Sequence, residues 1–138
     1  MKQIIKYGVL FIIFGTLYYF IEIVWRGYSH WTMWLLGATL GVIIGGINEF
    51  FTEDMSLLYQ SVISAMCVTV FEFVVGLIVN VWLGWNVWDY SQMRFQIMGQ
   101  ISLVYSWLWL GLSIPCIVLD DYLRNKLFNE KIPNYKLF

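Results

Sequence analysis

The sequence predicts an all-α integral membrane protein: a bundle of four transmembrane helices, with a short outer-surface helix before the last one. Hydrophobic residues make up 60% of the 138-residue chain and charged residues only 12%, whereas soluble proteins average roughly 45 to 50% and about 25%. The apolar residues form continuous runs, each long enough for a helix to cross the roughly 30 Å hydrocarbon core of a bilayer. Strands of a membrane barrel would alternate apolar and polar residues instead. We expect a single transmembrane domain of four helices.

The predicted spans are separated by short polar segments. Although the lysine-flanked start imitates a secretory signal, its apolar run is longer than an ordinary signal core, so we expect it to remain as the first span. Asp89 or Ser91 can cap an outer-surface helix from about Tyr90, because either side-chain oxygen can accept from the free amides that open a helix. The four spans are residues 4–24, 31–50, 56–82 and 97–119, followed by a cytoplasmic tail at 120–138.

Basic residues predict the orientation, because they collect on the cytoplasmic side of short loops. Only Arg26 and Arg94 lie in the first and third loops, and the second loop is acidic, with Glu53 and Asp54. We therefore expect a cell-membrane protein with both termini in the cytoplasm. The basic residues that flank the first and last spans are Lys2, Lys6, Arg124, Lys126, Lys131 and Lys136. Tryptophans near the predicted outer surface form an aromatic belt: Trp25, Trp31, Trp34, Trp82, Trp85 and Trp88.

Small residues predict how the helices meet. Gly37, Gly41 and Gly45 recur at every fourth position, so a neighbouring backbone can approach that face closely. A similar row in the third span, which a short loop joins to the second, is the expected partner: Ser61, Ala65 and Thr69. Packing within one chain and a homo-oligomer interface both fit these rows. Pro115 predicts a kink in the fourth span, because proline lacks a backbone donor.

Three glutamates lie in or beside the predicted spans, where a carboxylate must be paired, protonated or in contact with water. Glu22 and Arg26 are four residues apart and can pair on one helical face. Glu49 is close enough to the cytoplasmic end of its span to be solvated. Glu72 has no basic residue within one helical turn, so it must find a partner on another helix or stay neutral.

These residues lead to a hypothesis of an outward-facing polar ligand or ion pocket. A purely structural hydrogen-bonded role for Glu72 fits the sequence equally well. The predicted pocket consists of Glu22, Arg26, Glu72 and Asp89, lined by Gln100 and Ser106.

The sequence offers no set of residues for catalysis, metal or cofactor binding. Cys67 and Cys116 each lie in an apolar run, where a thiol packs as a small hydrophobe. His30, the one histidine, is expected at the membrane surface, and Asp120 and Asp121 at a solvated helix end. No phosphate-binding loop of the G-x-x-x-x-G-K-[ST] type is present. With a net charge of -1 and no basic stripe, nucleic acid is not an expected partner. We expect no enzyme activity, no metal and no cofactor.

Several short motifs resemble a known family. Glu22, Trp25 and Arg26 form one motif in the first span, and the others are W-D-Y-S at 88–91, G-Q-I-S-L at 99–103 and Y-S-W-L-W at 105–109. Together they resemble the putative ABC-transporter type IV membrane proteins. The resemblance implies a small multi-pass membrane protein of poorly defined activity. The segment between the first two spans is shorter here than the family pattern, which leaves open whether a ligand site is shared.

Two main functions fit the sequence. The first is a transport or ligand-binding membrane component that acts as an oligomer or with a partner protein, because four helices are few for an alternating-access transporter. The second is a structural or regulatory membrane protein with no transport pathway. An intramembrane enzyme is a third alternative. Membrane lipid is the one partner that the composition itself predicts.

Overall fold

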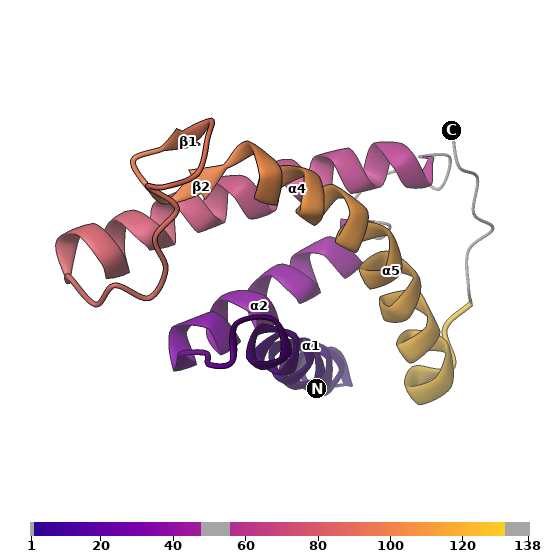
Figure 1. The fold of residues 1–138 in the computed structure, drawn as a ribbon. Coiled ribbons are helices and arrows are strands. Elements are labelled where there is room, and N and C mark those ends of the chain that lie inside the picture. The colour runs from indigo at the N-terminus through magenta and orange to yellow at the C-terminus, as the bar shows by residue number, and fades with distance from the viewer. Residues whose placement is uncertain (1, 48–55, 132–138) are drawn as a thin grey trace. The chain divides into compact units, whose positions relative to one another are not determined.

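The structure, a computed structural model, describes residues 2–47 and 56–131. The described elements are almost entirely helical, which confirms the predicted all-α class (Figure 1). The predicted solvated Glu49, the acidic loop with Glu53 and Asp54, and the end of the tail lie outside the described residues. In chain order the elements are α1 (Lys2–Arg26), α2 (Trp31–Gly45), α4 (Leu57–Gly76), the π-helical η1 (Leu77–Trp82), β1 (Gln96–Ile97), β2 (Ile101–Ser102) and α5 (Leu103–Phe128).

Three of the described helical segments are long and apolar enough to cross a membrane. They are α1 with 25 residues, α4 continued by η1 with 26, and α5 with 26. α2 is also apolar but shorter, with 15 residues, and its predicted end at Phe50 lies outside the described residues. The lengths of the three long helices support a membrane protein, because about 20 residues suffice to span the hydrocarbon core.

The chain forms two compact units. The first comprises Met1–Gln60 and Ile114–Phe138, and the second comprises Ser61–Ser113. α4 and α5 therefore each contribute to both units. α5 is helical on both sides of Pro115, and the kink predicted there stays a prediction.

In the first unit, α1 and α2 pack through their small residues. A methyl group built on Gly37 would lie 2.5 Å from Cδ2 of Tyr18, and one on Gly41 would overlap Phe14. From the other side, a methyl group on Gly15 would come within 2.7 Å of the Trp34 ring. Glycine is therefore needed for the two backbones to approach this closely.

The glycine row of α2 packs against helices of its own unit. Its third member, Gly45, lies against the carboxyl of Asp120 in α5. The sequence had led us to expect the row Ser61, Ala65 and Thr69 as the partner. That contact stays a prediction, and within the first unit Phe14 and Tyr18 of α1 fill the hollows that glycine leaves.

In the second unit, the segment between η1 and α5 is a loop with a small hairpin. β1 and β2 are antiparallel, with Gln96 opposite Ser102 and Ile97 opposite Ile101. The prediction of an outer-surface helix from about Tyr90 was wrong. The Tyr90 amide donates to the Gly99 carbonyl in the turn of the hairpin at 2.7 Å, which joins this segment to the hairpin. Left-handed backbone at Phe95, Met98 and Gly99 also interrupts any helix there.

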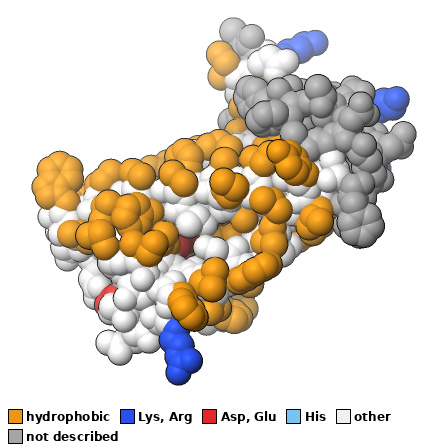
Figure 2. Space-filling view, turned by 90° about the horizontal axis from the view of Figure 1, so that it is seen from above, with side chains coloured by type: hydrophobic (Ala, Val, Ile, Leu, Met, Phe, Trp, Pro, Cys, Tyr) orange, Lys and Arg blue, Asp and Glu red, His pale blue; other side chains and the backbone are white. Residues whose placement is uncertain are grey.

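Much of the surface is apolar, as expected for a protein in lipid. Figure 2 shows a face on which hydrophobic side chains predominate and basic side chains lie at the margins. Four tryptophans of the predicted belt are well exposed: Trp25, Trp31, Trp82 and Trp85. Trp88 differs: it is 5% exposed, and its indole N–H donates to the Gln100 carbonyl at 2.9 Å. It is a core residue of the loop rather than a member of the belt.

Candidate functional site

Glu72 lies inside the second unit, on α4. Its side chain is buried at 4% exposure, and the indole Nε1–H of Trp109 on α5 donates to its Oε2 at 3.1 Å. A buried carboxylate is costly in an apolar medium unless it is hydrogen-bonded or neutral. The structure therefore supplies the partner on another helix that the sequence required for Glu72.

Hydroxyl groups extend this polar contact along the same two helices. Thr69 Oγ1 and Ser106 Oγ lie 3.1 Å apart. Thr69 precedes Glu72 by three residues and Ser106 precedes Trp109 by three, so each pair shares a helical face. The Ser113 hydroxyl, four residues beyond Trp109, donates to the Trp109 carbonyl at 2.7 Å. We call the set Thr69, Glu72, Ser106, Trp109 and Ser113 the polar seam.

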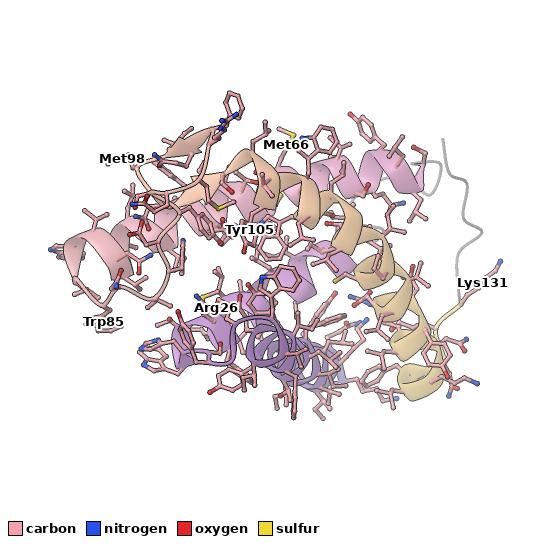
Figure 3. The ribbon with its side chains drawn as sticks, viewed as in Figure 1. Arg26, Met66, Trp85, Met98, Tyr105 and Lys131 are labelled. Atoms are coloured by element: carbon pink, nitrogen blue, oxygen red, sulfur yellow. The ribbon has the colours of Figure 1, made fainter. Side chains whose placement is uncertain are left out.

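Aromatic rings continue from the polar seam to the hairpin. The rings of Trp109 and Tyr105, one helical turn apart, have centroids 6.3 Å apart. Tyr105, labelled in Figure 3, stacks on Tyr90 with centroids 4.6 Å apart and planes 9° from parallel. Flat stacking of this kind fixes ring orientation. A continuous row of rings therefore connects the loop to the indole that contacts Glu72.

Asn80, in η1, binds both the loop that follows it and the hairpin. Its Oδ1 accepts from the amides of Val87 at 2.6 Å and Trp88 at 3.4 Å, and its Nδ2 donates to Gln100 Oε1 at 2.8 Å. A methyl group on Gly76 would lie 2.6 Å from that same Oε1. Gln100 was predicted as a pocket residue. The structure shows it buried, bridging Asn80 and the hairpin.

Asp89 occupies an exposed turn. Its Oδ1 accepts from the Ser91 amide at 2.9 Å. This backbone hydrogen bond, with a second from the Ser91 side chain, holds the pKa of the Asp89 carboxyl below its ordinary value. Asp89 therefore shapes the loop as an ionised turn residue, where the sequence suggested a helix cap.

Glu22 and Arg26 form the ion pair that their spacing predicted. Arg26 Nε lies 2.6 Å from Glu22 Oε2, and the Tyr18 hydroxyl donates to Glu22 Oε1 at 2.7 Å. The Arg26 guanidinium also lies over the Tyr28 ring, 4.6 Å from its centroid. This pair belongs to the first unit, whereas Glu72, Asp89, Gln100 and Ser106 belong to the second. The six-residue pocket stays a prediction.

The first unit contains buried charges that sequence reasoning missed. Asp120, Asp121 and Arg124 are 0%, 7% and 2% exposed, so the predicted solvated helix end was wrong. Arg124 Nε lies 2.7 Å from Asp120 Oδ2, and the Arg124 guanidinium lies 5.4 Å from the centre of the Tyr7 ring. Lys6 pairs with Glu130 at 3.2 Å. The spacing of Asp120 and Arg124 signalled a pair, but burial depends on the neighbouring helices.

An apolar groove lies elsewhere in the first unit. It has a volume of about 420 Å³ and is lined by Tyr19, Trp31, Trp34 and Leu35. Its lining is suited to lipid chains rather than to a polar ligand. The polar seam around Glu72 is therefore the candidate site.

Comparison with known proteins identifies the family. A model of the family described as putative ABC-transporter type IV matches residues 1–136, nearly the whole chain. The chain belongs to this family. No curated protein and no solved structure matches it significantly.

Three of the four motifs that resemble the putative ABC-transporter type IV family lie together in the second unit, whereas Glu22, Trp25 and Arg26 belong to the first. Tyr90 of the W-D-Y-S segment bonds to Gly99 of the G-Q-I-S-L segment, and Trp88 bonds to Gln100. Tyr105 and Trp109 of the third motif continue from Tyr90 to Glu72. In this member of the putative ABC-transporter type IV family, these three motifs thus form one structural cluster, which shares Ser106 and Trp109 with the polar seam.

Proposed function

We propose that the protein is a small multi-pass membrane component that binds a ligand or ion at Glu72 and acts in transport as an oligomer or with a partner protein. The observation that carries the proposal is the buried carboxyl of Glu72 within a membrane-spanning helix, in contact with Trp109. Ionisable residues at such positions commonly mark ion or substrate pathways. The family description, putative ABC-transporter type IV, supports the same class of function.

The chemistry of the polar seam limits what it can bind. Glu72 supplies one carboxyl group, and Thr69 and Ser106 supply hydroxyls that can donate or accept. Such a site suits a proton, a small cation or a polar group carried on a larger molecule. We propose that this site binds a ligand rather than catalyses a reaction. In the proposed orientation, the termini lie in the cytoplasm and the hairpin on the outer side of the cell membrane.

A structural role is the second candidate, and one observation favours it. The Glu72 carboxyl already accepts a hydrogen bond from Trp109, and Thr69 and Ser106 already contact each other. A satisfied polar contact between helices can serve to hold them together without any ligand. The binding role and the structural role differ in one measurable respect: only the binding role predicts a ligand or partner on the isolated protein.

Native mass spectrometry tests the proposal. The protein is extracted from its own membrane in mild detergent as wild type, Glu72→Gln and Glu130→Gln. Glutamine has nearly the same shape and keeps an oxygen that accepts from Trp109, so the fold should persist. Glu130→Gln is the matched control, because it removes a carboxyl from the other unit that belongs to no predicted pocket.

We expect a bound ligand or partner on the wild type and on Glu130→Gln, and its loss from Glu72→Gln. Identical spectra from all three, with a bare monomer in each, would refute the Glu72 site and support the structural role. Thermal unfolding of the same preparations separates loss of a ligand from loss of the fold.

A further inference from the structure

The hairpin of the second unit turns its apolar side chains outward. Phe95, Ile97 and Met98 are 77%, 55% and 62% exposed. Arg94, beside them, is also exposed. Figure 3 labels Met98 on the hairpin and Trp85 on the loop that leads to it. A hairpin in water normally does the opposite and shows polar residues to the solvent.

The polar groups of the hairpin are directed inward. Gln96 Oε1 accepts from the Gly99 amide at 2.6 Å, and Gln100 Nε2 donates to the Met98 carbonyl at 2.9 Å. The Leu103 amide donates to the Phe95 carbonyl at 3.1 Å. Irregular backbone is tolerated near a hydrocarbon phase only when its polar groups are satisfied within the protein. These bonds meet that requirement for several groups of the hairpin.

The base of the hairpin packs against the last residue of α4, short of the end of η1. Gln100 and Trp88 lie against Gly76, six residues before η1 ends at Trp82, which corresponds to about 9 Å along a helix. The 26 residues of α4 and η1 measure about 39 Å, compared with a hydrocarbon core of about 30 Å. If the last turns of η1 project among the headgroups, the base of the hairpin lies near the boundary between headgroups and acyl chains.

The residues next to the hairpin are consistent with this depth in the membrane. Trp82 at the end of η1 is 79% exposed, and Leu103 at the start of α5 is 47% exposed. Tryptophan favours the membrane interface. The exposed Arg94 can reach outward to lipid phosphate, with which its guanidinium forms charge-assisted hydrogen bonds. The apolar surface fits the acyl chains, and the tryptophan and arginine beside it fit the headgroup region.

We propose that the hairpin is a membrane-interface anchor, in which Phe95, Ile97 and Met98 insert among the lipids and Arg94 contacts their phosphates. The occupant of this surface is the bilayer itself. The anchor holds the loop and hairpin that carry Trp88 and Gln100, which Asn80 of η1 binds, and so fixes the outer end of the helix pair containing Glu72. It does not depend on whether Glu72 binds a ligand.

Methionine oxidation tests the anchor in the unaltered chain. Met98 on the hairpin and Met66 on α4 are 62% and 64% exposed from the protein, and Figure 3 labels both. The purified protein, in nanodiscs containing lipid alone, is treated with hydrogen peroxide, which converts a water-accessible thioether to the sulfoxide. We expect Met98 to react as slowly as the lipid-facing Met66. Rapid oxidation of Met98 with slow oxidation of Met66 would overturn the anchor.

Spin labels then measure the depth. On a background with Cys67→Ala and Cys116→Ala, labels at Phe95→Cys and Ile97→Cys should lie about 5 to 10 Å below the phosphates. A label at Gln92→Cys, an exposed position in the same loop, serves as the water-facing control. If the hairpin were a docking surface for another protein, its labels would be in water in these lipid-only nanodiscs, and the proposal would fail.

Discussion

Asp120 and Arg124 form an ion pair inside the protein, with 2.7 Å between Oδ2 and Nε and side-chain exposures of 0% and 3%. The pair lies where α2 presents Gly45, whose missing side chain leaves room for the Asp120 carboxyl. Breaking a buried pair by removing one partner is strongly unfavourable, because the other charge stays buried.

We therefore predict that Arg124→Met lowers the free energy of unfolding by about 3 to 5 kcal/mol. Unfolding in mixed detergent and dodecyl sulfate micelles measures the change. Lys126→Met is the control, because Lys126 is exposed on the same helix. The double variant Asp120→Asn with Arg124→Met should recover part of the loss. Equal effects of Arg124→Met and Lys126→Met would show that the pair is not buried.

The contact between Gly41 and Phe14 makes a second prediction. A methyl group on Gly41 would overlap the Phe14 side chain, so Gly41→Ala should destabilise the protein by about 1 to 3 kcal/mol through overpacking. Gly8 on α1 has no neighbour within 4 Å of an added methyl group. Gly8→Ala should therefore leave stability unchanged or slightly higher. The same micelle unfolding assay compares them, and a neutral Gly41→Ala would argue against close packing of α1 and α2.

Asn80 makes a third prediction. Because its side chain binds the Val87 and Trp88 amides and the Gln100 side chain, Asn80→Ala should release the loop. Amide hydrogen exchange of residues 83–100 should become faster. The increase should correspond to a loss of about 1 to 3 kcal/mol in the free energy of local opening. Gln92→Ala, at an exposed position of the same loop, should leave exchange unchanged. Unchanged exchange in Asn80→Ala would mean that other contacts hold the loop.

Asp89 makes a prediction about pH. Its folded pKa is lowered from the ordinary 3.8 by the Ser91 hydrogen bonds, so ionised Asp89 stabilises the turn at any pH above about 3.8. The stabilisation is lost as the pH falls through the lowered pKa, since the unfolded carboxyl then binds its proton more readily than the folded one.

A titration of the Asp89 carboxyl carbon by nuclear magnetic resonance measures this pKa. The midpoint should lie below 3.8 in the wild type and move up towards it in Ser91→Ala, which loses the side-chain donor but keeps the amide. A wild-type midpoint at or above 3.8 would contradict the turn geometry.

The short motifs that resemble the family predicted it from few residues, and the family match covers residues 1–136. They did not predict their own arrangement. The W-D-Y-S segment suggested a helix cap, whereas Asp89 closes a turn and Tyr90 bonds across to Gly99. A capping residue and a turn residue use the same side-chain oxygen to accept the same kind of amide, so local sequence does not distinguish them.

The sequence by itself determined the helical class, the membrane character and the pairing of Glu22 with Arg26. These follow from the length of apolar runs and from the four-residue spacing of a helix, both of which act locally along the chain. The tertiary structure decided which helices the glycines of α2 face, that Trp109 is the partner of Glu72, and that Asp120 and Arg124 are buried. Each of these depends on residues distant in the chain, because in lipid one apolar face resembles another and only the fit of side chains against a particular neighbour selects the contact.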